Sequence, residues 1–581
     1  MKISNTLYRW LAGCFLALFA IGAHAAAAPA APAAKPVDVQ KCYSCHDNIE
    51  EFHAKGKHAK VNCANCHTGT DEHLASKDKK AVKPVTIMDH RACATCHKDQ
   101  YESFVKLNYD SPARLEKATF KGRSPLFDKI MEGYGFTIEH GEPRSHPFML
   151  VDQWVVDRGF GGRFQFKDWT YNTKAEAAAN SAWDVITDKD PASSDQKKFM
   201  RETVTAVNPV CMNCKTQDHI LNWKFMGDKD PSAKWDRTSK PVEFARAVKH
   251  PLNCFMCHDP HSTGPRVVRD ALIQAVVDRK LGTYPMDAEK SSKTTMTKVT
   301  FDRDGKPFRA IGLLNKPDSN LMCAQCHVEY NCGVGFDCAG PNNTVKMTPD
   351  PDQKMITMAD PRTNLFPWTN VFGYKKVMTE EYKFKDFKHA FTGAMLPKIQ
   401  HPEMETFWGS KHEKAGVQCK DCHMGKAKNA QGKTYTSHQQ KSPKFMIKET
   451  CLKCHTEWTE QEAKYNMEAI QNYTRGKMAD AEFWISSLID SIVQAKNAGV
   501  SKDLIEKAYD HQYDATLYWE WWTAENSDGF HNPQDARESL TRSIETSKAG
   551  VAMLRKAMGE MRVSAAPAAA APAAAPAPAP K

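Results

Sequence analysis

After its first 25 residues the chain lacks any run approaching the ~20 consecutive apolar residues of a membrane-spanning helix, which argues against a membrane-embedded protein. The one marked apolar run, Trp10–Ile21, follows a basic stretch and precedes Ala23-His24-Ala25, the pattern of a secretory signal peptide. We therefore predict that residues 1–25 are a signal peptide and that the mature protein is soluble and periplasmic. A lipoprotein signal at Leu11-Ala12-Gly13-Cys14 is less favoured, because most of the apolar run follows the cysteine.

The chain also has few cysteines that stand alone. Of its 19 cysteines, 16 form eight C-x-x-C pairs, Cys14 belongs to the signal peptide, and only Cys332 and Cys338 remain. An exported protein can use cysteines for disulfides, but a disulfide does not demand a histidine directly after each pair. Seven of the eight pairs have one. This regularity indicates a repeated cofactor site.

C-x-x-C-H is the attachment motif of c-type haem. The two thiols form thioethers with the porphyrin vinyl groups, and the adjacent imidazole ligates the iron. Zinc binding is the alternative for these residue types, but seven copies in one exported chain favour haem. The motifs are Cys42-Cys45-His46, Cys63-Cys66-His67, Cys93-Cys96-His97, Cys254-Cys257-His258, Cys323-Cys326-His327, Cys419-Cys422-His423 and Cys451-Cys454-His455.

The eighth pair, Cys211-Met212-Asn213-Cys214-Lys215, has a lysine where the others have a histidine. A lysine amine must lose its proton to bind iron, so metal binding and its pKa are coupled. The axial ligand is one of the few means by which a protein tunes haem reactivity. We predict an eighth haem with Lys215 as its proximal ligand. The alternative is a spare C-x-x-C pair, either redox-active or disulfide-bonded.

Histidine supply and net charge agree with eight haems. Of the 23 histidines, 15 remain after the seven motif histidines and His24 of the signal peptide are removed. Seven six-coordinate haems need seven distal histidines, so the supply is ample. We expect the lysine haem to keep an open distal face, where a small substrate can bind. Each ferric haem adds about one negative charge, so eight haems bring the formal charge of +10 to roughly +2. A net charge this small does not indicate nucleic-acid binding.

Strand signals are sparse, and the predicted fold class is mainly α: a multihaem cytochrome c with little regular sheet, a haem-packed core and long C-terminal helices. Residues 26–40 are an Ala/Pro-rich linker. Residues 41–110 carry three motifs and few apolar residues, so the porphyrins must form the core of this N-terminal trihaem domain. Residues 111–460 carry the lysine motif and four others, and form the catalytic pentahaem domain.

The remaining chain, residues 461–562, has no haem motif. Apolar residues at helical spacing predict three long helices, at Glu460–Ala498, Lys502–Thr523 and Pro533–Met558. We expect them to form a packing bundle that also holds subunits together; a binding face for a partner is the less favoured alternative. Residues 563–581 form a disordered Ala/Pro tail.

Three sequences follow the lysine motif in order: Cys323-Ala-Gln-Cys-His327-Val-Glu329-Tyr330, Lys398-Ile-Gln400-His401-Pro-Glu403 and Asn526-Ser-Asp-Gly-Phe-His531. Together with that motif they resemble the multihaem cytochrome c nitrite reductases. Pentahaem members have one lysine haem followed by four histidine haems, and this pattern matches residues ~111–560. The three additional N-terminal motifs resemble the octahaem branch. The resemblance implies the six-electron reduction of nitrite to ammonium.

The family's active site holds an arginine, a tyrosine and a histidine above the lysine haem. By position these are Arg158, Tyr330 and His401, and Lys215 completes the catalytic set. Arg158 stands 12 residues after His146 of an E-P-R-x-H motif, and Arg144 within that motif is its rival. Each has an ordinary alternative: a propionate partner or surface charge for the arginine, a core residue for the tyrosine and a haem ligand for the histidine.

The resemblance also implies a calcium ion beside the active site. Its ligands would be the Glu329 carboxylate, the carbonyls of Tyr330 and Lys398, and the side-chain oxygen of Gln400. These are the hard oxygen donors that calcium requires. The alternative for Glu329 is an ordinary ion pair with a nearby lysine.

Distal ligands carry over from the family for four haems: His146 for the Cys323 haem, His412 for the Cys451 haem, His438 for the Cys254 haem and His531 for the Cys419 haem. For the first three haems only proximity in sequence is available. It favours His53, His58 and His73, with His90 and His140 as rivals.

Cys332 and Cys338 lie outside any haem motif. A disulfide between them is compatible with export. The octahaem branch offers a thioether between the active-site tyrosine ring and a cysteine two residues later, and Tyr330 and Cys332 have this spacing. This covalent link is favoured, and it would lower the pKa and oxidation potential of the phenol.

An ammonia-forming nitrite reductase is also expected to accept hydroxylamine and sulfite, because all bind the same open iron. The alternatives are another octahaem oxidoreductase, which oxidises hydroxylamine or reduces tetrathionate, and a pure electron-transfer cytochrome whose haems are all six-coordinate. The expected partners are a redox donor protein or a quinol-oxidising membrane protein, and further copies of the chain, with a trimer favoured.

Overall fold

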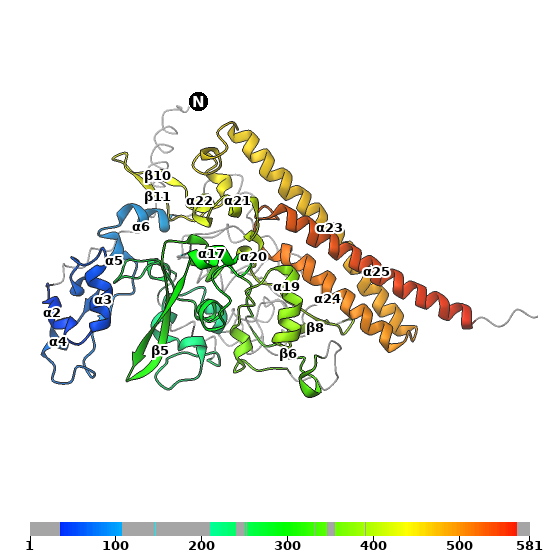
Figure 1. The fold of residues 1–581 in the computed structure, drawn as a ribbon, viewed down its shortest axis with the longest axis horizontal. Coiled ribbons are helices and arrows are strands. Elements are labelled where there is room, and N and C mark those ends of the chain that lie inside the picture. Colours follow the sequence, from blue (N-terminus) through cyan, green and yellow to red (C-terminus); the bar gives the residue numbers. More distant parts are fainter. Residues whose placement is uncertain are drawn as a thin grey trace, which may run out of the picture.

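The computed structural model describes residues 35–106, 209–239, 252–331, 333–345, 355–389 and 391–565, and the single residues 146, 244 and 250. The predicted signal peptide and C-terminal tail lie largely outside these ranges. The N-terminal region lies at one end of the molecule and three long C-terminal helices lie at the other, with the irregular central region between them (Figure 1). None of the helices in the described ranges is long and apolar enough to cross a membrane.

The N-terminal region is built of short elements that separate its three motifs. Only four apolar side chains of residues 35–106 are buried, namely those of Val37, Tyr43, Ala64 and Phe104, in keeping with a region whose core is not made by side chains. Its packing begins before residue 41, because the Asn62 side chain bonds both the Val37 N–H (3.1 Å) and carbonyl (2.7 Å). The elements are α2 Val39–Tyr43, α3 Asp47–Lys55, η1 Cys63–Asn65, β1 His67–Thr68, α4 Thr70–Ala75, β2 Val85–Thr86, α5 Arg91–Ala94 and α6 Lys98–Phe104.

The central region is mostly short helices and loops, with one three-stranded antiparallel sheet of order β3-β5-β4. Its hairpin turns at Asp304-Gly305, where both residues have positive φ (53° and 75°), as the tight turns that match strand twist require. Its helical elements are α13 Pro209–Met212, α14 His219–Asn222, η4 Phe225–Gly227, η5 Cys254–Met256, α16 Asp270–Ile273, η6 Gln274–Asp278, α17 Ala288–Lys293, α18 Ser319–Ala324, η7 Pro341–Asn343, η8 Pro361–Asn364, α19 Val371–Lys376, η9 Val377–Glu381, α20 Glu403–Phe407, α21 Lys411–Lys414, α22 Cys419–His423, η10 Pro443–Phe445 and η11 Cys451–Lys453. Its strands are β3 Arg266–Val267, β4 Met296–Arg303, β5 Lys306–Leu314, β6 Phe336–Asp337, β7 Phe384–Lys385, β8 Phe387–Lys388, β9 Met395–Leu396, β10 Lys426–Lys428 and β11 Thr434–Thr436.

The three long C-terminal helices confirm the prediction: α23 Glu460–Asn497, α24 Lys502–Ala524 and α25 Pro533–Ala565. Thr459 and Glu462 form a reciprocal capping box at the start of α23. Helix α25 continues seven residues past the predicted Met558, into the segment expected to be disordered. The largest apolar core joins all three helices to α19 and the strands β7, β8 and β9. The mainly α fold class is confirmed.

Lys385 in β7 places a cation inside this core. It is 2% exposed, and its ammonium lies 5.3 Å from the centre of the Tyr513 ring. Burial lowers its pKa to about 8, although Cys338 and Asp510 oppose the shift. The unfolded chain keeps this proton up to about pH 10.4. The unfolded state therefore binds more protons between pH 8 and about pH 10, and the free energy of unfolding rises with pH across that window.

The Lys385→Met variant is expected to lose this rise and to be more stable than the parent at pH 7 by about 1–3 kcal/mol, because each unit of pKa shift corresponds to about 1.4 kcal/mol. Denaturant unfolding at pH 7, 8, 9 and 10 measures both effects. Lys375→Met is the control, since Lys375 is less buried and its ammonium lies 2.7 Å from Asp514. Parallel pH profiles for the parent and Lys385→Met would contradict the prediction.

Candidate haem and catalytic site

Each of the seven motif histidines faces the ring of a second histidine. A metal–imidazole bond is about 2 Å long and the ring centre lies about 1 Å behind the nitrogen, so two imidazoles that share one metal have centres about 6 Å apart. The observed separations of 6.1–6.5 Å fit an iron between each pair. The pairs are His46–His73 (6.5 Å), His67–His261 (6.2 Å), His97–His58 (6.1 Å), His258–His438 (6.5 Å), His327–His146 (6.3 Å), His423–His531 (6.4 Å) and His455–His412 (6.4 Å).

Four of these partners, His146, His412, His438 and His531, lie opposite the motif histidine for which the sequence analysis named them. For the N-terminal motifs, His73 and His58 also face motif histidines.

His53 differs from the prediction. The Tyr43 hydroxyl donates to its Nδ1 (2.5 Å) and its Nε2 donates to the Val61 carbonyl (3.1 Å), so both ring nitrogens are engaged within the domain. His261 faces His67 instead. His261 was not among the predicted ligands, although it follows the motif residue His258 by only three positions. His90 lies against Tyr101 and Phe104, and His140 lies outside the described residues.

Hydrogen bonds and electrostatic interactions between cysteine thiols link the motifs into one series. The series branches at the Cys323/Cys326 motif, which adjoins both the lysine motif and the Cys419 motif. The neighbouring thiols are Cys42 and Cys63, Cys66 and Cys93, Cys93 and Cys254, Cys257 and Cys323, Cys326 and Cys214, Cys323 and Cys419, and Cys422 and Cys451. Groups attached at successive motifs would therefore lie close together, as stepwise electron transfer requires.

Backbone hydrogen bonds close the turn both in the lysine motif and in the histidine motif at Cys323. In the motif that begins at Cys323, the His327 N–H donates to the Cys323 carbonyl (2.9 Å), four residues earlier. The Lys215 N–H donates to the Met212 carbonyl (2.9 Å), three residues earlier. Cys214 is buried. The side chain of Cys211 lies outside what the structure describes.

A buried arginine, Arg269, which was not predicted from the sequence, interacts with both Tyr330 and Cys214 of the lysine motif. The Arg269 guanidinium is fully buried and lies 5.7 Å from the centre of the Tyr330 ring and 5.3 Å from that of Phe366. Asp270 is 3.5 Å away, but none of the three guanidinium nitrogens has a hydrogen-bond partner. A buried cation whose donors are unused marks a place where an anionic group fits.

Three of the expected calcium ligands meet at one loop. Glu329 is fully buried; its Oε2 accepts the Gln400 N–H (2.6 Å), and its own N–H donates to the Glu405 carboxylate (3.1 Å). The Lys398 N–H donates to Asp386 (2.9 Å). Within the described ranges no three His, Cys, Asp or Glu side chains gather as a metal site, but the expected donors here are one carboxylate, one amide and two carbonyls.

His401 lies between this loop and α20. Its carbonyl accepts the Glu403 N–H (2.9 Å), and the Glu403 carboxylate lies 3.7 Å from Nδ1 of His327. Burial raises the pKa of Glu403, but the bond to His327 and the charges of His327 and His401 outweigh it and bring the pKa to about 2. A carboxylate on the outer nitrogen of a ligand imidazole fixes the orientation of the ring.

Two predicted residues lie outside the described ranges. These are Arg158 and Cys332, together with the rival Arg144. The Tyr330–Cys332 link and the Cys332–Cys338 disulfide therefore stay predictions. Cys338 itself is fully buried.

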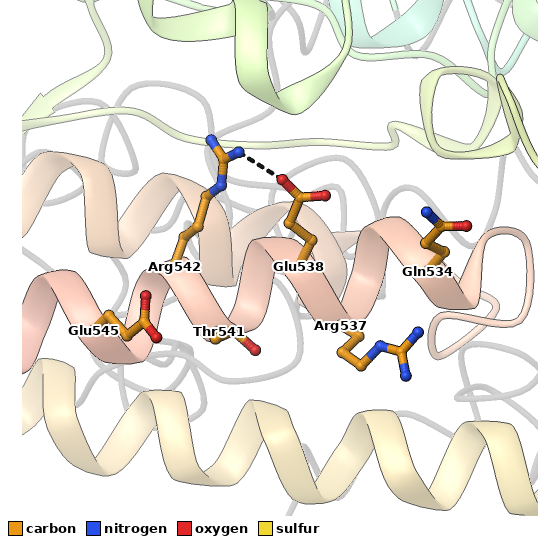
Figure 2. A pocket seen from close by; sticks show the side chains of 6 residues that line it. All are labelled: Gln534, Arg537, Glu538, Thr541, Arg542 and Glu545. Carbon is orange, nitrogen blue, oxygen red and sulfur yellow. Dashed lines mark hydrogen bonds and ion pairs between the residues drawn. The ribbon is translucent and has the colours of Figure 1, made fainter.

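A surface pocket of about 430 Å³ runs along one face of α25. Figure 2 shows its polar lining, including the Glu538–Arg542 ion pair. No motif residue, Tyr330 or His401 contributes to it, so it is separate from the candidate site. Its lining residues are Gln534, Arg537, Glu538, Thr541, Arg542 and Glu545.

The repeated motifs and the facing histidines define a c-type cytochrome, whose cofactor is haem c. The family model of cytochrome c552 matches residues 185–578, and the chain belongs to this family. A curated relative, the cytochrome c nitrite reductase subunit NrfA of Nitratidesulfovibrio vulgaris, is 25% identical over 479 residues, which are 79% of this chain and 74% of the relative.

A solved structure, the cytochrome c nitrite reductase of Desulfovibrio desulfuricans, is similar in fold. It has a TM-score of 0.50 and 19% sequence identity over 83% of this chain and 89% of its own. That protein is described for two calcium sites in its catalytic subunit.

Proposed function

We propose that the protein is an octahaem cytochrome c that reduces nitrite to ammonium at a haem ligated by Lys215. The observation that carries the proposal is the setting of the lysine motif. Its Cys214 adjoins Cys326, at the motif where the series branches, and the buried Arg269 interacts with both Cys214 and Tyr330. The family membership and the activity for which the Nitratidesulfovibrio relative is named support the same reaction.

The reaction joins nitrite with six electrons and eight protons to give ammonium and two water molecules. When bound, the lysine-ligated haem supplies the iron and the electrons for cleavage of the N–O bonds. The role of Arg158 and His401 is to attract the anion and to stabilise negative charge on its oxygens. His401 and Tyr330 donate hydrogen bonds or protons at the substrate. The seven histidine pairs hold the groups that deliver electrons one at a time.

The test is ammonium formation from nitrite by the purified protein with reduced viologen as donor. Stoichiometric ammonium supports the proposal. Unconsumed nitrite, with every haem low-spin and no binding of cyanide, would instead indicate a pure electron carrier. Hydroxylamine and sulfite are further expected substrates, and parallel assays measure them.

We also propose that Glu329, Gln400 and the carbonyls of Tyr330 and Lys398 hold a calcium ion. The buried Glu329 carboxylate and its bond to the Gln400 N–H support this placement, because they bring the carboxylate to the same loop as the other donors. The ion would fix the backbone of Tyr330 and the loop that carries His401. It would therefore position two of the proposed catalytic side chains.

The Glu329→Gln variant keeps the size of the side chain but loses its charge. We expect its calcium affinity to fall by at least about 10–100-fold, because even outer residues of metal sites have effects of this size. Nitrite reduction should fall with it, and added calcium should restore part of the rate. Calcium titration and metal analysis after dialysis measure the affinity. Glu545→Gln on exposed α25 is the control, and equal calcium content in all three proteins would reject the site.

The C-terminal helices and the export signal are part of the same proposal. Helix α23 exposes Tyr465 (71%), Tyr473 (52%) and Phe483 (62%), and such aromatic side chains are enriched at interfaces. We propose that this helix contributes to a homo-oligomer, with a trimer favoured, and that the exported protein takes electrons in the periplasm from a redox protein or a quinol-oxidising membrane protein.

A further inference from the structure

A turn at residues 258–264 is held by a buried ion pair. One oxygen of the Asp259 carboxylate accepts the N–H groups of His261 (3.0 Å) and Ser262 (2.8 Å), and the other accepts from Nη1 of Arg266 (2.9 Å). Asp259 and Arg266 are 4% and 6% exposed. Two backbone bonds also close the turn: the Asp259 N–H donates to the Gly264 carbonyl (3.0 Å), and the Asp259 carbonyl accepts the Thr263 N–H (2.8 Å). The direction in which His261 leaves the turn is therefore fixed.

His261 leaves this turn toward the N-terminal region. Its ring centre is 6.2 Å from that of His67, and the two ring planes are 11° apart. This separation is too large for direct stacking of the rings and fits two imidazoles on opposite sides of one iron, which gives about 6 Å. Every other facing pair of this kind has the same spacing, within 6.1–6.5 Å.

The same turn also orients the neighbouring histidine pair. Nδ1 of His58 donates to the Pro260 carbonyl (3.0 Å), which leaves Nε2 to point toward His97. A bond of this kind on the outer nitrogen selects the tautomer and the ring orientation of a metal ligand. His258, which begins the turn, faces His438. The seven residues of this turn, 258–264, therefore contribute a histidine or a hydrogen bond to three successive histidine pairs.

The N-terminal region is shaped to receive the turn. A side chain at Gly56 would place its Cβ 2.4 Å from the His261 carbonyl oxygen, so only glycine permits this approach. The next residue, Lys57, donates its N–H to the Thr263 hydroxyl (3.0 Å). Nearby, the Asn253 amide donates to the Met88 carbonyl (3.0 Å). Both sides of the contact are therefore built for a fixed docking position.

We propose that His261 is the distal iron ligand of the haem attached at Cys63 and Cys66, so that a coordination bond joins the N-terminal region to the catalytic region. The proposal rests on haem attachment at that motif. One ligand of this iron, His67, comes from the N-terminal region, and the other comes from the turn beside the His258 motif. The bond holds the N-terminal haems at a constant distance from the rest of the series, and the domain cannot swing or detach while the iron is bound.

The first test replaces His261 with alanine in the full-length, haem-loaded protein. Electron paramagnetic resonance should show one haem changed from low-spin to high-spin relative to the parent, and added imidazole should reverse the change. His53→Ala is the matched control and should leave every haem low-spin. Limited proteolysis should release the N-terminal region faster from His261→Ala than from either other protein. The proposal would be overturned if His53→Ala lost a low-spin haem, or if His261→Ala kept every haem low-spin.

A second variant covers the case in which His261→Ala does not assemble. His261→Met offers the iron a thioether, and a methionine ligand raises the potential of a c-type haem above that of a bis-histidine haem. A spectropotentiometric titration should show one haem moved to higher potential and the others unchanged, and curves that superimpose on the parent would contradict the ligand assignment. The haem content of the parent is measured by mass spectrometry and by the pyridine haemochrome assay. This measurement tests the octahaem proposal independently of the ligand assignment.

Discussion

Replacement of Lys215 by histidine is expected to lower the rate of nitrite reduction by at least about 100-fold while the number of attached haems stays the same. The axial ligand is a principal determinant of haem reactivity, and even changes in residues behind a metal ligand cost about 10–100-fold. The variant keeps the two cysteines and acquires the motif that the other seven sites use. Attachment should therefore survive, and the chemical distinction of the eighth site should be lost.

The chemistry of the side chain supports a specific role for the lysine. A lysine amine must lose its proton before it can bind iron, whereas a neutral imidazole already offers a free nitrogen. The substitution therefore makes the eighth site chemically like the other seven.

The measurement for Lys215→His combines the initial rate of ammonium formation with mass spectrometry of the haem content. Lys229→His, an exposed substitution in the same region, is the control and should retain the parental rate. A Lys215→His variant that is fully loaded and as fast as the parent would show that the catalytic iron is elsewhere. If the variant loses one haem, its spectrum is compared instead with the spectrum expected for the seven remaining sites.

Local sequence determines the parts of this molecule that the sequence analysis predicted well. The three C-terminal helices follow from apolar residues at helical spacing and from caps such as Thr459 with Glu462, because both act within a few residues. The attachment motifs are equally local. Each contains both cysteines and the proximal ligand within five residues, so their positions need no knowledge of the fold.

Which histidines face each other depends on which distant segments meet, and proximity in sequence does not predict it. His53 is close to the second motif in the chain, yet its two nitrogens bond to Tyr43 and Val61. The ring that faces His67 comes from His261, on a turn nearly 200 residues later. The buried Arg269 beside Tyr330 is similarly invisible in the sequence, because only packing shows that its donors are unused.

Replacement of His401 by asparagine is expected to lower kcat for nitrite reduction by about 100- to 1000-fold, the usual cost of removing one preorganised donor that stabilises developing negative charge. Asparagine still offers a hydrogen bond but no titratable proton, so the loss should be greatest for the steps that consume protons. His511→Asn on α24 is the matched control, because that histidine packs against Gly550 of α25, away from the motifs, and should leave the rate unchanged.

The same variant separates catalysis from iron ligation, the ordinary alternative for this histidine. All seven motif histidines already face another histidine, so His401 is not needed as a distal ligand. His401→Asn should therefore keep its haem content and the parental low-spin spectrum while ammonium formation falls. Loss of one low-spin haem in this variant would assign His401 to iron instead. An unchanged rate with an unchanged spectrum would show that His401 has no part in the mechanism. The proton-donor role would then fall to Tyr330, and the Tyr330→Phe variant tests this in the same assay.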